Sequence, residues 1–278
     1  MCIIEGLKIE LNGRNMKIIS VLNAKGGVAK TTSSLALADY LSKSHKVLFL
    51  DLDPQANATS TLLNLDIGQE AEEPTLSDTI HDFVMRQKHS IKKSIRPADL
   101  GNLDMSPAHL DLEPYKDFFK QKLPRPDRLI AEILKPVKKD YDFVICDCPA
   151  DISLYVESAI SASDLCLVPT TYDLYGFKAL QILLKVMFSI HDSDYDRFRV
   201  LYTRVKSSAT KIQKEMSSYI EIFEKREVVL PYRIPEEQAV TNAQARHHSL
   251  MLNNAYKNST ARKRYEDVGE FIKEYCHV

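Results

Sequence analysis

The sequence feature that most constrains the fold is a glycine-containing loop, Asn23–Thr32, which reads Asn-Ala-Lys-Gly-Gly-Val-Ala-Lys-Thr-Thr. The residues before it, Lys17–Leu22, form a short apolar run suited to a buried parallel strand. The residues after it, Ser33–Leu41, place apolar side chains at helical spacing. A strand, a glycine loop and a helix therefore follow one another directly, which is a building unit of a parallel α/β sheet.

The loop also has the composition of a phosphate-binding loop. Backbone N–H groups are unpaired where a helix begins, and the helix dipole favours an anion there. Gly26 and Gly27 let the backbone approach phosphate oxygens closely because they carry no Cβ atom. Lys30 is expected to reach the β- and γ-phosphates of a nucleotide, and Thr31 to place its hydroxyl on Mg²⁺. An ordinary Gly-Gly turn is the alternative, but the second lysine, Lys25, and the flanking strand and helix favour a P-loop.

Strand-like and helix-like segments alternate along the whole chain. We expect strands at 17–22, 47–50, 103–106, 143–147, 165–169, 199–203 and 228–230. Helices are expected at 30–43, 57–64, 108–119, 125–138, 152–162, 174–190, 208–224 and 257–275. This alternation predicts an α/β fold, a single-domain P-loop NTPase with a mostly parallel, twisted sheet and helices on both faces. Residues 16–278 should form this domain, and residues 1–15 should be a disordered N-terminal extension.

Two aspartates stand at the carboxyl ends of predicted strands. In a parallel sheet, ligands lie beyond the carboxyl ends of the strands, so Asp53 is expected close to the P-loop. A carboxylate there can orient or activate the attacking water, or hold a water on Mg²⁺. Asp147 ends the apolar run Phe143–Asp147, as in a Walker B segment, where the carboxylate contacts Mg²⁺ through water. For Asp53, the alternative is an Asp-Pro turn that only closes the strand.

Composition excludes several classes of protein. The chain of 278 residues has a net charge of −1, which excludes a globally basic protein but allows a local basic patch. The five cysteines are an odd number, and three of them lie in strand-like runs, so we expect reduced thiols in a cytoplasmic protein. No stretch has the pattern of a signal peptide or a membrane-spanning helix.

Three motifs resemble those of the ParA/MinD ATPases. Lys25–Thr32 is similar to the deviant P-loop of that family, K-G-G-x-G-K-[ST]-T. Asp51–Asn57 is similar to its switch I motif D-x-D-P-Q-x-N, and Asp147–Ala150 to its switch II motif D-x-P-A. The resemblance covers residues 16 to about 250, and it is to the small, Soj-like ParA type. Ala29 departs from the family's usual glycine, which would cost about 1–2 kcal/mol if this residue has a positive φ.

The resemblance implies a set of site residues. Lys25, Lys30 and Asp53 would be catalytic, with Lys25 acting on the nucleotide of the other subunit in an ATP-dependent homodimer. ATP and Mg²⁺ would be the cofactors, and Thr31, Asp53 and Asp147 would hold the metal. The implied nucleotide-binding residues are Lys25, Gly26, Gly27, Val28, Ala29, Lys30, Thr31, Thr32, Thr203, Arg204 and Pro231.

Charge along the chain is uneven, and one family feature is absent. The family's arginine run after Ile234-Pro235, which contacts DNA, is replaced here by Glu236–Ala239. In contrast, the segment Arg246–Arg264 carries five basic residues and no acidic one. If the protein binds DNA, the expected contacts are Lys206, Lys211, Arg246, Arg262, Lys263 and Arg264. The alternative is an ordinary solvated helix face.

The implied function is an ATP-dependent partition (DNA segregation) ATPase with slow basal hydrolysis. It would dimerise when it binds ATP, and the dimer would bind non-specific DNA of the nucleoid. It would not bind a membrane, and a ParB-like centromere-binding partner would stimulate its ATP hydrolysis. Three alternatives share this core. They are a MinD-like membrane-associated positioning ATPase, an electron-transfer ATPase resembling the nitrogenase iron protein, and a regulator of polysaccharide or flagellar assembly. The sequence names neither the cargo nor the partner.

Overall fold

The computed structural model describes most of the chain from Met16 to Val278. The described residues are 16–66, 68–86, 90–98, 100–191, 196–206, 221, 227–245, 250 and 254–278. The predicted extension 1–15 and, apart from Glu221, the predicted helix 208–224 lie outside the described residues.

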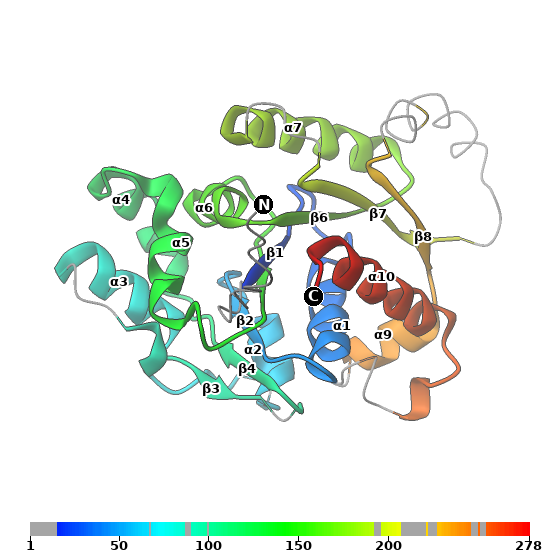
Figure 1. Ribbon diagram of the computed structural model, residues 1–278, viewed down its shortest axis with the longest axis horizontal. Helices are drawn as coiled ribbons and strands as arrows, with labels where there is room; N and C mark the ends of the chain where they lie inside the picture. Colours follow the sequence, from blue (N-terminus) through cyan, green and yellow to red (C-terminus); the bar gives the residue numbers. More distant parts are fainter. Residues whose placement is uncertain are drawn as a thin grey trace, which may run out of the picture.

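One eight-stranded sheet forms the centre of the domain (Figure 1). Its strand order is β3-β4-β2-β5-β1-β6-β7-β8, and every neighbouring pair is parallel except β3 with β4. The strands are β1 Lys17–Val21, β2 Val47–Asp51, β3 Arg96–Pro97, β4 Leu103–Ser106, β5 Phe143–Asp147, β6 Leu165–Thr170, β7 Phe198–Val205 and β8 Val229–Pro235. Because β1 lies between β5 and β6, the loop that follows it opens at the carboxyl ends of the central strands, where ligands of such sheets bind.

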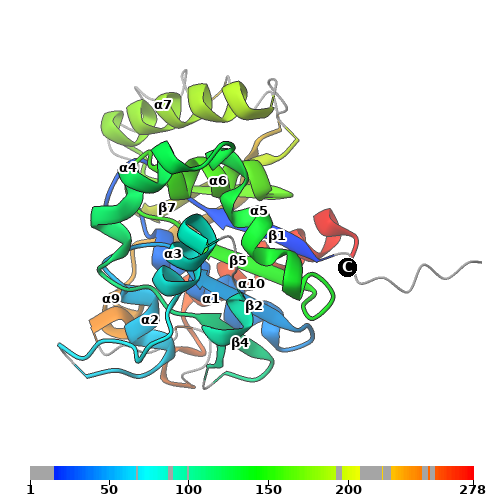
Figure 2. The same cartoon turned by 90° about the vertical axis from the view of Figure 1, so that its left-hand side faces the viewer.

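Helices cover both faces of the sheet (Figures 1 and 2). One hydrophobic core lies under α3, α4, α5, α6 and α7, and a second lies under α1, α2, α9 and α10. The helices are α1 Lys30–Ser42, α2 Asn57–Leu62, α3 Leu76–Arg86, α4 Leu112–Lys122, α5 Leu129–Leu134, α6 Leu154–Ala162, α7 Leu174–His191, α9 Gln238–Ala245 and α10 Thr260–Cys276. This three-layer arrangement confirms the predicted α/β fold class.

The last helix, α10, packs closely against the helix that follows the P-loop. A Cβ atom on Gly269 would lie 2.2 Å from Cδ1 of Tyr40, so only glycine allows the two helices to approach this closely. The apolar side of α10, including Val268 and Ile272, is fully buried. The Tyr265 hydroxyl lies 3.0 Å from Oγ of Ser33 in α1. The carboxyl-terminal helix is therefore part of the core.

All seven predicted strands are confirmed, but one strand and two α-helices of the structure were not predicted. β3 is a two-residue antiparallel edge strand, and α9 is short and polar. α3 carries polar and acidic residues, but Leu76 and Ile80 give it a buried apolar side. The predicted helix 125–138 is wrong in its length. It consists of α5 between two 3₁₀ turns that contain Pro126 and Pro136, because proline cannot continue an α-helix.

Candidate nucleotide-binding site

Strands β6 and β7 fix the glycine loop in place. Asn23 is buried, accepts a hydrogen bond from the Lys25 N–H at 2.9 Å and donates one to the carbonyl of Pro169 in β6 at 2.7 Å. The Thr203 hydroxyl of β7 donates to the carbonyl of Val28 at 2.9 Å. These contacts hold both sides of the loop, so its N–H groups are ordered for an anion without a ligand.

Ala29, at the end of the loop, has a left-handed backbone with φ of 64° and ψ of 35°. An L-residue other than glycine pays about 1–2 kcal/mol in this region. The conformation is held by α1, since the N–H and the hydroxyl of Ser33 both donate to the Ala29 carbonyl, at 3.0 and 2.7 Å. The positive φ explains why glycine is usual at this position, and this chain carries the strain of an alanine.

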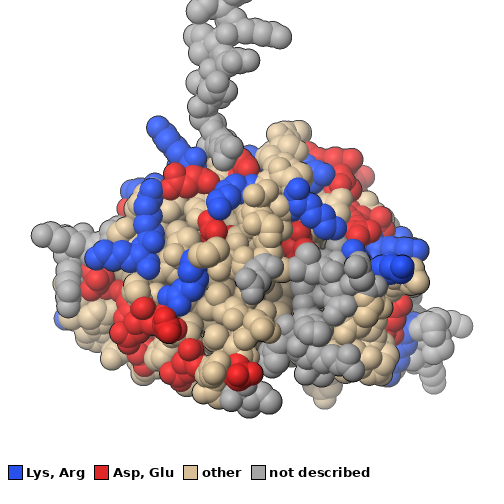
Figure 3. Space-filling model, turned by 90° about the horizontal axis from the view of Figure 1, so that it is seen from below, with Lys and Arg blue, Asp and Glu red and all other residues tan. Residues whose placement is uncertain are grey.

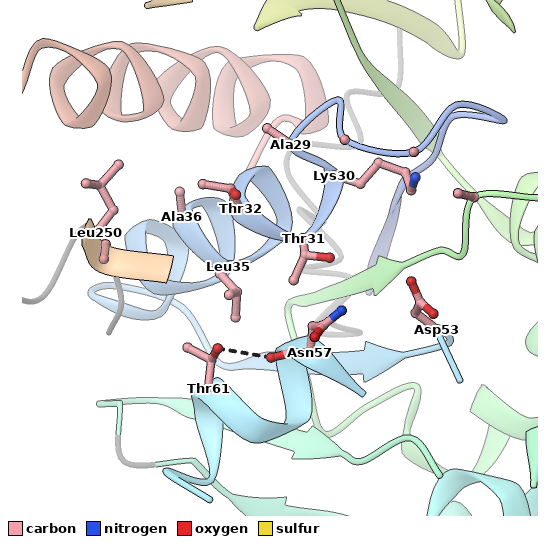
Figure 4. Close-up of a pocket in the computed structure, with 14 residues that line it drawn as sticks. Ala29, Lys30, Thr31, Thr32, Leu35, Ala36, Asp53, Asn57, Thr61 and Leu250 are labelled. Atoms are coloured by element: carbon pink, nitrogen blue, oxygen red, sulfur yellow. Dashed lines mark hydrogen bonds between the residues drawn. The ribbon is translucent and has the colours of Figure 1, made fainter. Parts of the chain in front are cut away.

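A cavity of about 360 Å³ opens in front of the loop (Figure 4). It extends from the loop past Asp53 and Ala150 to Leu35 in α1 and to Leu250. Among the predicted residues, those that line it are Gly26, Gly27, Ala29, Lys30, Thr31, Thr32 and Asp53. The structure thus brings together side chains from the loop, the end of β2 and the end of β5.

Lys30 is the cation at the centre of this cavity. Its ammonium group donates to the Lys25 carbonyl at 3.2 Å, and the residue is buried. Burial lowers the pKa of Lys30, and the carboxylates of Asp147 and Asp53 oppose that shift. A phosphate group would supply the negative charge that such a buried ammonium needs.

Asp147 has the surroundings of a metal-binding carboxylate. Its Oδ1 accepts a hydrogen bond from the Ser34 hydroxyl at 2.8 Å, and both Ser34 and Thr31 act to lower the pKa of the carboxyl group. Its Oδ2 is buried and has no hydrogen-bond partner among the described residues. Burial raises the pKa of Asp147, so the ionised form needs a compensating cation. Thr31, Asp53 and Asp147 are oxygen donors of the kind that Mg²⁺ prefers, and they fit this ion.

Lys25 points away from the cavity. Its ammonium group forms an ion pair with Asp173 at 2.9 Å and donates to the Thr171 hydroxyl at 2.9 Å. Asp173 also accepts the N–H of Gly176 at 2.8 Å, which places its carboxylate at the beginning of α7. The second lysine of the loop is therefore held by a residue of the β6–α7 connection, beside the nucleotide site and outside it.

A second cavity, of about 270 Å³, meets the loop at Gly27 and Ala29. Arg204, which has a φ of 53°, lines it, donates to the Gly27 carbonyl at 3.0 Å and forms an ion pair with Glu236 at 3.0 Å. The other two predicted base neighbours lie elsewhere. Thr203 is buried under the loop, and Pro231 is exposed on β8, while Pro235 lines the cavity.

Two of the residues predicted to contact DNA pair with acidic residues, so the net positive charge around them is lower than the sequence suggests. Lys211 and Arg246 lie outside the described residues. In α10, Arg262 pairs with Glu266 at 3.5 Å and Arg264 with Asp267 at 3.1 Å. Lys206 and Lys263 are exposed. Basic and acidic side chains are also mixed on the face shown in Figure 3.

Sequence reasoning missed several residues that shape the site. Asn23 is the first residue of the loop, and Asp173 follows the end of β6. The rule that selected Asp53, a polar residue just beyond the carboxyl end of a parallel strand, also selects Asp173. No pattern in the sequence indicates that Glu236 pairs with Arg204, because the two residues meet only when β7 and β8 are side by side.

The strain at Ala29 leads to a stability prediction. We expect Ala29→Gly to raise the free energy of unfolding by about 1 kcal/mol, because glycine adopts a positive φ without penalty. The matched control is Ala36→Gly in the interior of α1, which should lower it by about 1 kcal/mol or more. Urea unfolding followed by circular dichroism measures both. Equal destabilisation by the two substitutions would contradict a strained Ala29.

Comparison with known proteins agrees with this geometry. The profile of a family described as an AAA domain matches residues 16–200. Soj, the sporulation initiation inhibitor protein of Bacillus subtilis, is 34% identical over 172 residues, which are 62% of this chain and 64% of Soj. The chain thus covers less than two thirds of that relative.

Solved structures share the fold over nearly the whole chain. An ATP complex of a McdA variant from Cyanothece has a TM-score of 0.78 at 23% identity and covers 95% of this chain and 97% of its own. A putative plasmid partition protein from Borrelia burgdorferi, bound to AMPPNP, has a TM-score of 0.74 at 25% identity and covers 93% and 99%. With its deviant P-loop and two switch motifs, the chain belongs to the AAA domain family, as a ParA/MinD-like P-loop ATPase.

Proposed function

We propose that the protein is a partition ATPase that binds ATP with Mg²⁺, dimerises, binds non-specific DNA and hydrolyses ATP on contact with a ParB-like partner. The observation that carries this proposal is the shared cavity onto which Lys30, Thr31 and Asp53 open, with the Oδ2 of Asp147, unpartnered among the described residues, behind it. The Soj relative and the partition-protein structure support the same assignment.

Each group in the cavity has a distinct task in this proposal. The loop N–H groups and Lys30 hold the β- and γ-phosphates at the beginning of α1. A Mg²⁺ ion held by Thr31, Asp53 and Asp147 would neutralise charge on the phosphates. Asp53 orients the attacking water, because its carboxylate lies at the cavity wall opposite the loop (Figure 4).

Base binding fits the second cavity, which adjoins the loop. Arg204 and Pro235 line it, and we place the adenine there instead of beside Thr203 and Pro231. The Arg204 guanidinium already bridges the loop carbonyl of Gly27 and the carboxylate of Glu236. It can therefore pack over a base without losing its charge partners.

Lys25 fits a role across the dimer interface. Its side chain is 28% exposed and is paired with Asp173, outside the cavity that holds Lys30. In a dimer with the two loops face to face, Lys25 can leave Asp173 for the nucleotide of the facing subunit, as an arginine finger does. Asp173 keeps its hydrogen bonds from Thr171 and Gly176, so its carboxylate is not left without partners.

Two alternatives fit the structure less well. A MinD-like membrane helix would require α10 to leave the core, because its apolar side is buried against α1 and β8. Within the described part of the chain, no helix is long and apolar enough to span a membrane. An iron–sulfur cluster shared between subunits needs surface cysteines, whereas Cys146 and Cys148 are fully buried.

The proposed roles of Lys30 and Asp53 are separable. We expect Asp53→Ala to retain ATP binding and lower hydrolysis by about 10²–10⁴-fold, the usual loss for one positioned catalytic base. Lys30→Ala should instead abolish nucleotide binding, because it removes the cation at the phosphates. A fluorescent ATP analogue measures binding and phosphate release measures turnover. Wild-type turnover in the Asp53 variant would move the catalytic role elsewhere.

The cross-subunit role of Lys25 makes a different prediction. Lys25→Ala should leave ATP binding to the monomer nearly intact and block ATP-dependent dimerisation, since the lysine acts only on the facing subunit. Analytical ultracentrifugation with a non-hydrolysable ATP analogue decides this. Lys43→Ala, at the end of α1, is the control for loss of an exposed lysine. A Lys25 variant that dimerises as the wild type does would rule out the role.

Non-specific DNA binding should depend on the basic residues of α10. We expect the double charge reversal Arg262→Glu with Arg264→Glu to weaken binding to all sequences alike, with dimerisation and ATPase activity retained. The plot of the logarithm of the DNA-binding constant against the logarithm of the salt concentration should become less steep. Its slope should decrease in magnitude by about 0.9 for each phosphate that the protein no longer neutralises. The control, Lys120→Glu with Lys135→Glu, changes the charge equally on the opposite side of the sheet. Identical binding by both double variants would show that α10 does not contact DNA.

A further inference from the structure

Asp51, the first carboxylate of the switch I motif, is fully buried and does not line the nucleotide cavity. We propose that Asp51 is a positioning residue that acts through Asp53, by closing the switch segment 53–59 into one rigid loop. This inference rests on the proposed role of Asp53 in hydrolysis. The resemblance to the switch I motif gives a role to Asp53 only, and this inference gives a role to Asp51 as well.

Both oxygens of Asp51 are used by the switch segment. Oδ2 accepts hydrogen bonds from the N–H and the hydroxyl of Thr59, at 2.8 and 2.7 Å. Oδ1 accepts the N–H of Asp53 at 3.2 Å. One carboxylate at the end of β2 therefore ties the first and the last residue of the segment together.

Thr59 extends the link to a second strand. Its hydroxyl, which donates to Asp51, also accepts the N–H of Ala108 at 3.0 Å. Ala108 follows β4, which neighbours β2 in the sheet. The switch segment is thus fixed at both ends to the sheet, and Thr59, at 1% exposure, is the central residue of the link.

The segment between the two ends is strained. Ala56 has a φ of 52°, in the left-handed region, and its N–H donates to the Asp53 carbonyl at 2.9 Å. A residue in this region persists only where its surroundings fix it. The hydrogen bonds of Asp51 at either end provide that restraint, and they keep the Asp53 carboxylate at the cavity wall.

Asp147 provides a contrast on the neighbouring strand. Asp51 and Asp147 are paired in the register of β2 and β5, and both are buried. Asp147 leaves Oδ2 without a partner among the described residues, whereas both oxygens of Asp51 accept hydrogen bonds from the switch segment. The two aspartates therefore have different roles. Asp147 has an oxygen available for a metal ion, and Asp51 holds the chain that carries Asp53.

The test removes the Thr59 hydroxyl and leaves Asp51 in place. Thr59→Val keeps the size of the side chain, and Thr59→Ser keeps the hydroxyl. We expect Thr59→Val to lower kcat by about ten- to a hundredfold, as for a displacement of up to 1 Å at a catalytic group. Affinity for ATP should not change, which is the pattern of an interaction used only in the transition state. Thr59→Ser should restore most of the turnover.

Thr79→Val is the matched control, because Thr79 is also buried in a helix and its hydroxyl donates to Ser94 and makes no hydrogen bond to the described residues of the switch segment. It should lower the melting temperature without changing kcat. Amide hydrogen exchange of residues 53–59 provides a readout independent of catalysis, and it should be faster in Thr59→Val than in Thr79→Val.

The outcomes separate this inference from the proposed function. Unchanged kcat and unchanged exchange in Thr59→Val would overturn the positioning role, as would an equal loss of ATP affinity and kcat. Absence of hydrolysis by the wild type would contradict the proposed function alone. In that case, the rate of amide hydrogen exchange of residues 53–59 in Thr59→Val still decides whether Asp51 and Thr59 fix the segment.

Discussion

The site depends on hydrogen bonds that tie the glycine loop to strands β6 and β7. Asn23 joins the loop to Pro169, and Thr203 joins Val28 to the next strand. Without these bonds, the loop would lose entropy each time it closed on a phosphate, and part of the binding free energy would be spent on ordering it. At the end of the loop, the hydrogen bonds from Ser33 hold Ala29 in a left-handed conformation that costs about 1–2 kcal/mol. The fold therefore loses some stability at Ala29, and its glycine loop is ordered before an anion binds.

Burial of like charges is the second constraint. Asp51 and Asp147 stand on adjacent strands in the interior, where desolvation raises the pKa of each carboxyl group. The fold compensates them differently. Asp51 receives hydrogen bonds from the switch segment, whereas the charge of Lys30 opposes the rise in the pKa of Asp147, which keeps one oxygen unpartnered among the described residues. Binding of a nucleotide with its metal ion would complete the compensation at Asp147, which couples ligand binding to the stability of the sheet centre.

The second cavity connects the loop to the carboxyl-terminal helix. Glu237 lines this cavity and also accepts hydrogen bonds from the Ser259 hydroxyl and the N–H groups of Thr260 and Ala261, at the beginning of α10. Tyr265 lines it from the next turn of α10 and contacts Ser33 of α1. A ligand in this cavity therefore touches the residues that anchor the helix on which we place the DNA contacts.

The sequence alone determined the succession of strands along the chain, the α/β class and the phosphate loop, because apolar periodicity and the loop chemistry are local. It also determined that Asp53 lies at the loop, since parallel strands end at one edge of the sheet. Only the tertiary structure decided that Lys25 pairs with Asp173 and that Arg204 pairs with Glu236. Each of these depends on which residues packing brings together from distant segments, and no local pattern encodes that.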